Sequence, residues 1–295
     1  MRRALAALAL LLSCVPALAA NHPVDWYLSV DNDVWFSTDR WYTSGVRISR
    51  LERDIEWGLA QEIYTPDTSR LEFGDPDRAP SARLLASVAR HFRGSSAYQT
   101  VGLAVGVRGP AALGRQTADL IHEIAPAPPL DWSRQLENEY DASVVWTRTQ
   151  RSDAQSPMGD GFKLHFGATL GNQVLFAHLG AEYRIGSPAA RGLSSPLLRF
   201  APTPLITDSG ARAIGWSAYL GASIRAVGRN ELLTRDYDPT MPPLEINKAV
   251  ARVAAGVTYA ASWGSVHFGL AQESREHKGQ TMGHAFGNLT LQLTF

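Results

Sequence analysis

The sequence predicts an all-β protein: a transmembrane, antiparallel up-and-down β-barrel of about twelve strands, with one short helix near residues 111–123. Apolar and polar residues alternate with a period of two through nearly all of the chain after residue 20, as strands with two unlike faces require. The alternating runs reach ten residues or more, whereas strands of water-soluble proteins average about 5–6. The last such run ends the chain on Phe295, which is typical of the closing strand of an outer-membrane barrel.

The N-terminus predicts export. Residues 1–20 have the features of a secretory signal peptide: two arginines, an apolar run, and the small residues Ala17 and Ala19 around a cleavage site. A lipoprotein signal ending at Cys14 is the alternative, and it fits the surrounding residues only loosely. We therefore expect 1–20 to be a signal peptide and 21–295 to form one barrel domain in the bacterial outer membrane.

The composition excludes several classes of protein. The 295 residues carry 28 basic and 28 acidic side chains, so we expect no nucleic-acid partner, because such proteins usually have a basic excess. Apolar residues make up 45% of the chain, which predicts a folded protein rather than a disordered one. Cys14 is the single cysteine, which excludes a disulfide scaffold and a cysteine-based metal site.

The alternation locates the strands. In the run from 247, Val253, Val257 and Tyr259 lie on one face, and Arg252 and Thr258 lie on the other. The predicted strands lie near 24–34, 43–51, 56–65, 82–92, 97–108, 135–149, 160–171, 173–186, 213–226, 247–263, 264–273 and 284–295. A short turn at 171–172 and long polar segments at 187–212 and 227–246 predict short turns on one side of the membrane and long loops on the other.

One segment departs from the strand pattern. After Gly109 and Pro110, apolar and small residues recur at helical spacing as far as His122, and Pro126 stops the run. A short helix inside an all-β chain is a local exception, and such exceptions are candidate functional sites. His122 lies on this helix with Asp119 one turn before it, although a lone histidine is more often a surface or packing residue.

A second candidate lies at the end of the first strand, in the run from Asp31 through Asn32 to Asp33. Strict alternation turns Asn32 toward lipid and Asp33 toward the lumen. An amide is costly in hydrocarbon, so either the membrane ends there or another element covers Asn32; an ordinary solvated turn is the simpler alternative. The sequence contains no HExxH spacing and no G-x-S-x-G motif, so zinc and serine-elbow sites are unsupported.

Together these stretches resemble the outer-membrane lipid A 3′-O-deacylases, the LpxR family. Ordered matches cover residues 30–140, and the remainder matches only in its strand pattern. The matching stretches are Asn32-Asp33, D-R-x-x-Y-T-x-G from Asp39 to Gly45, Ala60 to Pro66, Asp77-Arg78-Ala79 with Ser81-Ala82, Val105 to Pro110, the helix to His122, Trp132 to Asn138, and the C-terminal strand.

The resemblance implies an active site between the barrel wall and the short helix, facing the outer leaflet. The family hydrolyses the ester of the 3′-linked acyloxyacyl chain of lipid A with a divalent cation, typically Ca²⁺. Carried over by motif position, the catalytic residues are Asn32, Asp33, Thr43 and His122, with Asn32 and Asp33 as cation ligands. The expected partners are lipid A, as lipopolysaccharide, and the surrounding outer-membrane lipids, and we expect a monomer.

These residue types suit ester hydrolysis. His122 would take a proton from the attacking water, since histidine is the natural base near neutral pH. The oxygens of Asn32 and Asp33 suit Ca²⁺, which would stabilise the developing negative charge. Thr43 would orient water or the ester, and its alternative role is that of a covalent nucleophile activated by His122.

The chain also departs from the family pattern. A Lys-Arg pair suited to a lipid A phosphate is missing after Pro66, so Arg70 is the candidate substrate-binding residue there, with Arg78 as a further cation. A tyrosine expected eight residues past His122 is replaced by Leu130. Two other functions therefore stay open: a catalytically silent barrel or porin with an open polar lumen, and an outer-membrane phospholipase with a Ser–His pair on the lipid-facing wall.

Overall fold

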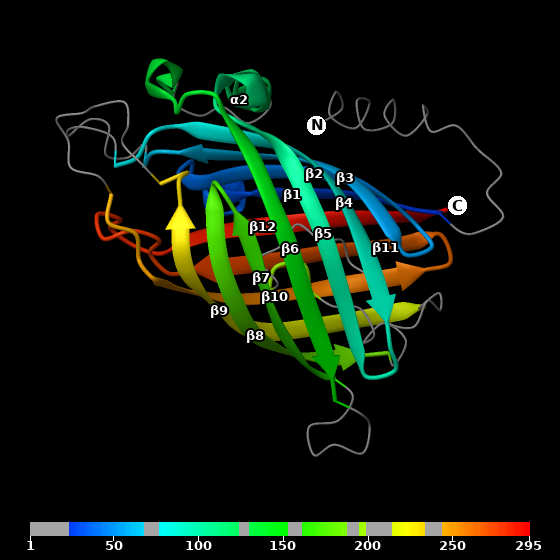
Figure 1. Ribbon diagram of the computed structural model, residues 1–295. Helices are drawn as coiled ribbons and strands as arrows, with labels where there is room; N and C mark the ends of the chain where they lie inside the picture. Colours follow the sequence, from blue (N-terminus) through cyan, green and yellow to red (C-terminus); the bar gives the residue numbers. More distant parts are fainter. Residues whose placement is uncertain are drawn as a thin grey trace.

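The chain folds into a closed β-barrel (Figure 1). The computed structural model describes residues 24–67, 77–123, 130–152, 161–187, 195–198, 214–233 and 244–295. The predicted signal peptide and Arg70 lie outside these ranges. Twelve antiparallel strands each pair with their neighbours in sequence, and the first pairs with the last. The predicted fold class is therefore confirmed.

The elements follow the predicted order closely. The strands are β1 (Val24–Asn32), β2 (Trp41–Glu52), β3 (Ile55–Thr65), β4 (Ser81–Arg93), β5 (Ala97–Arg108), β6 (Glu139–Arg151), β7 (Phe162–Gly171), β8 (Val174–Gly186), β9 (Gly215–Asn230), β10 (Ala249–Ala261), β11 (Gly264–Glu273) and β12 (His284–Thr294). The short helices are η1 (Asp33–Phe36), η3 (Pro110–Ala112), α2 (Gly114–His122) and η4 (Trp132–Arg134). Backbone hydrogen bonds between Val24 and Phe295 complete the seam between β1 and β12.

The two faces of the wall differ as the alternation predicts. On β10, Val253, Val257 and Tyr259 are more than half exposed on the outside of the barrel. Arg252, on the same strand, turns inward and binds Glu273, with Nη2 2.6 Å from Oε2. An apolar exterior around a polar interior is the arrangement of outer-membrane barrels. Within the described residues, no helix is long and apolar enough to cross a membrane.

The interior is filled by paired charges. Arg225 binds both Glu273 and Glu276, and Arg47 binds Glu56 at 2.6 Å. Buried charges are tolerated when they are paired and hydrogen-bonded, as these are. A cavity of about 200 Å³ remains among these side chains in the lumen.

The predicted sorting of short turns and long loops is wrong for two connections, β7–β8 and β8–β9. In an antiparallel barrel successive connections alternate between the two ends, so the short β7–β8 turn lies at the same end as α2. The long β8–β9 connection, which contains 187–212, lies at the opposite end, with the β2–β3 and β10–β11 turns.

Residues 195–198 of this connection fold back into the lumen. Leu197 and Leu198 are buried there in a cluster with Tyr219 and Phe286, and the amide of Ser195 donates to Glu182. Gly221 makes room for this segment, since a Cβ at that position would clash with Leu198. Residues 195–198 therefore occupy part of the lumen beside the cavity.

Replacing Leu198 should measure how firmly this segment is packed. Leu198→Ala is expected to lower the free energy of unfolding by roughly 2–5 kcal/mol, the usual effect of a buried leucine truncation. Urea unfolding of the barrel refolded into lipid vesicles measures the change. Met282→Ala, at an exposed site in the β11–β12 loop, is the control and should change stability little. Equal midpoints for both variants would contradict the packing.

Candidate functional site

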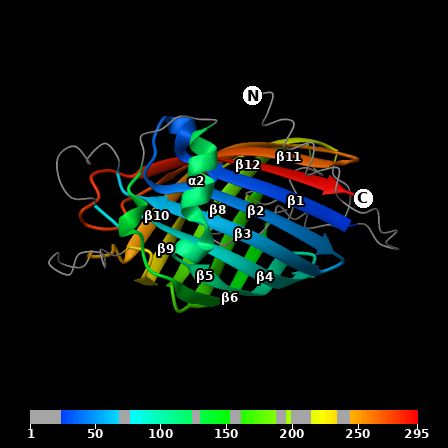
Figure 2. The same cartoon turned by 90° about the horizontal axis from the view of Figure 1, so that it is seen from above.

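A small cavity lies between α2 and the outer face of the barrel wall. Figure 2 shows α2 crossing the outside of the wall that β3 and β4 form. The cavity has a volume of about 20 Å³, which is room for one water molecule. It is lined by Asn32, Asp39, Thr43, Ser44, Ile63, Thr65, Ala118, Ile121, His122 and Leu130.

The helix is held against the wall by close packing of small residues. Ala112 and Ala118 pack on Ile63, Ala82 and Trp132. A Cβ at Gly114 would clash with Ala82, so glycine permits the close approach. Polar bonds fix the start of the segment: Gln61 Nε2 donates to the carbonyl of Ala112 at 2.6 Å. This helix supplies the cover that an outward-facing Asn32 requires.

Asn32 and Asp33 point in different directions. Asn32 reaches the cavity, and its Oδ1 accepts a hydrogen bond from the amide of Val34 at 2.7 Å, so it also caps η1. Asp33 turns into the β1–β2 loop, where its Oδ2 accepts bonds from Thr38 Oγ1 and the Arg40 amide, both at 2.9 Å. The structure therefore does not bring the two predicted cation ligands together.

Burial also changes the protonation of Asp33. Its side chain is almost inaccessible to water, and this desolvation raises its pKa from 3.8 to about 8, although the bonds from Arg40 and Thr38 act in the opposite direction. In this structure the Asp33 carboxyl is therefore bonded within its own loop, with its pKa raised by burial.

A β-bulge places Thr43 in the cavity. On β2 and β3, Tyr42 pairs with Tyr64 and Ser44 pairs with Ile63, which leaves Thr43 as an extra residue without a partner on β3. Bulges re-aim side chains in this way, and they recur beside active sites. The Thr43 hydroxyl lies 2.5 Å from that of Thr65, the last residue of β3.

His122 lies close to the carboxylate of Asp39, a residue that was not among the predicted catalytic residues. Its Nε2 lies 3.6 Å from Oδ2 of Asp39, in the β1–β2 loop. Burial raises the pKa of Asp39, while the nearby His122 and hydrogen bonds from Thr43 and Thr65 act in the opposite direction. Asp39 and Thr65 both belong to stretches that carried the family resemblance, and that was the available signal for them.

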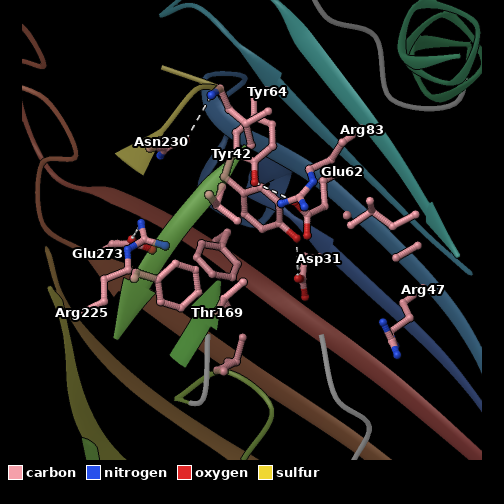
Figure 3. A pocket seen from close by; sticks show the side chains of 18 of the residues that line it. Asp31, Tyr42, Arg47, Glu62, Tyr64, Arg83, Thr169, Arg225, Asn230 and Glu273 are labelled. Carbon is pink, nitrogen blue, oxygen red and sulfur yellow. Dashed lines mark hydrogen bonds and ion pairs between the residues drawn. The ribbon is translucent and has the colours of Figure 1, made fainter. Parts of the chain in front are cut away.

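The same strands carry a different set of side chains inward. Figure 3 shows Asp31, Tyr42, Glu62, Tyr64 and Arg83 around the lumen cavity. The residue next to each of these in the sequence faces the outside of the barrel or lies in the wall beneath α2. Tyr42 donates to Asp31 at 2.7 Å, and Tyr64 donates to Glu62 at 2.8 Å. The outer cavity therefore rests on a hydrogen-bonded lumen.

Arg78 lies on this inner side. Its guanidinium is buried over the Tyr64 ring, 4.9 Å from the centroid, and its Nη2 donates to the carbonyl of Leu232 at 2.7 Å. The structure thus does not bring this predicted substrate-binding residue to the cavity that contains His122.

The oxygen atoms at the outer cavity suit a hard cation in kind. Asn32, Asp39 and Thr43 offer an amide, a carboxylate and a hydroxyl, the ligand types that Ca²⁺ prefers. Across the described ranges, no group of three or more histidine, cysteine, aspartate or glutamate side chains could hold a metal ion. A cation here would therefore depend on neutral oxygens in addition to the one carboxylate.

Comparison with known families identifies this arrangement. The family described as Outer membrane protein LpxR matches residues 5–295. The chain belongs to the LpxR family. Its barrel is accordingly an outer-membrane barrel, and the cavity under α2 lies on the wall of an LpxR-type fold.

Solved structures agree on the fold. LpxR from Salmonella typhimurium is 20% identical, with a TM-score of 0.74 over 92% of this chain and 100% of that chain. The Pseudomonas putida toluene transporter TodX is 10% identical, with a TM-score of only 0.32 over 96% of this chain and 92% of that chain. No curated protein sequence matches this chain significantly.

The unusual state of Asp33 can be tested directly. Its carboxyl carbon should titrate near pH 8 in NMR spectra of the barrel in detergent micelles, and Asp33→Asn should remove that transition. Because the folded state holds the proton and the unfolded state loses it above about pH 4, stability should fall as pH rises from 4 to 8. In Asp33→Asn this part of the pH dependence should vanish. A titration near pH 4 would show that Asp33 is solvated.

Proposed function

We propose that the protein is an outer-membrane esterase that removes the 3′-O-linked acyloxyacyl group of lipid A by hydrolysis. One observation carries this proposal: His122, Asp39, Asn32 and Thr43 surround a water-sized cavity on the outside of the barrel. The cavity lies between α2 and the outer face of the barrel wall, in a chain of the LpxR family. Lipid A of the outer leaflet is then the substrate, and water is the second reactant.

The mechanism begins with His122 as a general base. The imidazole takes a proton from a water in the cavity while the water oxygen attacks the ester carbonyl. The carbonyl becomes a tetrahedral oxyanion, which the Asn32 amide can stabilise by donating a hydrogen bond. The imidazolium then returns its proton to the departing sugar oxygen, so the products are a free fatty acid and a 3′-hydroxyl.

The partners of Thr43 favour an orienting role over a nucleophilic one. Its hydroxyl interacts with Thr65 and Asp39, which leaves His122 to act on water. A threonine nucleophile would instead need to donate to the imidazole that activates it.

A divalent cation such as Ca²⁺ is part of the proposal. The oxygens of Asn32 and Thr43 at the cavity would hold it, and when bound it would supply positive charge next to the ester carbonyl. Arg70 remains the candidate for contact with a phosphate of lipid A.

The phospholipase alternative has less support. It requires a serine that donates to a histidine at the lipid-facing wall. Ser44 lines the same cavity, but in the described part of the chain the charged partner of His122 is Asp39.

His122→Ala should abolish deacylation, with a loss of at least roughly 100-fold, because a general base contributes 10²- to 10⁴-fold. Mass spectrometry of lipid A, from cells that lack other lipid A-modifying enzymes, measures the product. Gln116→Ala, on the exposed side of α2, is the control and should remain active. Heat-modifiable migration in gels checks that each barrel assembles. Unmodified lipid A in wild-type cells supplied with Ca²⁺ would overturn the function, and an active His122→Ala variant would overturn the site.

Chelation tests the cation. Purified wild-type protein should lose deacylase activity in EDTA and recover it when excess Ca²⁺ is added, because oxyanion stabilisation depends on the bound charge. The same treatment should leave gel migration of the folded barrel unchanged. Full activity in EDTA would show that the side chains and backbone stabilise the oxyanion without a metal.

A further inference from the structure

We infer that Asp39 is a positioning residue for His122: its carboxylate lies at the same cavity, faces Nε2 of the imidazole and orients the ring. The inference rests on the proposed hydrolysis, in which His122 is the base. It adds two residues to the site, Asp39 and Thr65, and it assigns the two ring nitrogens different roles.

The carboxylate is itself held in place. Asp39 lies in the β1–β2 loop and lines the cavity beside Thr43 on β2 and Thr65 on β3. The hydroxyls of the two threonines lie 2.5 Å apart, and both threonines line the cavity under α2 together with Asp39. Asp33 fixes the loop from behind by accepting from Thr38 and the Arg40 amide. The loop that carries the carboxylate is therefore anchored by its own hydrogen bonds.

The helix brings the imidazole to this carboxylate. His122 is the last residue of α2, and its Nε2 lies 3.6 Å from Asp39 Oδ2, with the side chains 22% and 13% exposed. This is an ion-pair distance rather than a hydrogen bond, and such contacts often tighten when substrate closes the site. At this distance the carboxylate can restrict the orientation of the imidazole ring.

The geometry also selects the reacting nitrogen. Because Nε2 faces the carboxylate, the neutral ring should carry its proton there, and Nδ1 is then the nitrogen that accepts a proton from water. A carboxylate that holds the tautomer and steadies the imidazolium is the same device that orients histidine in Ser-His-Asp hydrolases.

Asp119 provides a matched comparison. It lies one turn before His122 on the same helix, so the sequence alone makes it the more obvious partner. In the structure its carboxylate turns to the exposed side of α2, 3.7 Å from Nε of Arg115, and both side chains are about two-thirds exposed. An exposed pair of this kind contributes little. Replacing Asp119 therefore changes the charge of the helix without touching the proposed contact.

The kinetic test compares Asp39→Asn, Asp39→Glu and Asp119→Asn, using lipid A in detergent as substrate. Asp39→Asn should lower kcat roughly 10- to 100-fold with KM within about twofold, the usual size for losing a group that orients a functional histidine. Asp39→Glu should recover part of kcat, and Asp119→Asn should match wild type. Heat-modifiable migration confirms assembly of each barrel. An Asp39→Asn enzyme with wild-type kcat would overturn the inference, as would one in which Asp119→Asn shows the same loss.

A second measurement does not depend on activity. The ¹⁵N NMR shifts of the His122 ring should show the proton on Nε2 in wild type, a mixed tautomer in Asp39→Asn, and no change in Asp119→Asn. If wild type fails to cleave lipid A yet shows this pattern, the proposed function fails and the positioning role stands. If wild type cleaves lipid A but the ring proton lies on Nδ1, the positioning role fails and the proposed function stands.

Discussion

The packing of α2 against the outside of β3 and β4 is the contact on which the rest of the site depends. In a barrel every strand residue faces either lipid or lumen, so a polar side chain on the outer face has no aqueous partner. Asn32, Thr43 and Thr65 are such residues, and they are tolerated because α2 covers them. The glycine at position 114 permits that cover to lie close to the wall. The helix therefore converts an unfavourable stretch of barrel exterior into an enclosed polar cavity.

The lumen gives this cavity a firm base. Tyr42, adjacent to Thr43, bonds to Asp31 and packs edge-on against Phe286, with ring centroids 5.1 Å apart. Phe286 in turn belongs to the cluster formed by the returning segment at Leu197 and Leu198. Residues that must hold a geometry are best mounted on packed elements rather than loops. The segment that returns into the lumen thus also supports the inner side of the bulge that aims Thr43.

The strands and the helix were predictable because period-two and helical patterns are local properties of the sequence. The approach of His122 to Asn32 and Thr43 followed from the family resemblance, and the structure places all three at one cavity. The direction of Asp33 was not predictable, because capping at Asn32 turns the chain into η1 and ends the alternation there. The Asp39 contact joins a loop to a helix far along the chain, and composition and spacing do not reveal such a pairing. The length of the connection that contains 187–212 predicted the wrong end of the barrel for it. Counting the strands would have assigned this connection to the end opposite α2.

The position of the site explains why a hydrolase can be built on the outside of a barrel. Ester hydrolysis needs water, and the surrounding membrane excludes it, so the protein must hold the water and let the lipid come to it. A cavity of about 20 Å³ beside His122 meets the first need. Access for the lipid is favoured by Leu113 and Leu120 on the α2 segment. Each is about half exposed or more, so the outer surface of the helix is compatible with acyl chains. The same cover brings His122 to within 3.6 Å of the Asp39 carboxylate, so the polar contact and the apolar cover are formed by one element.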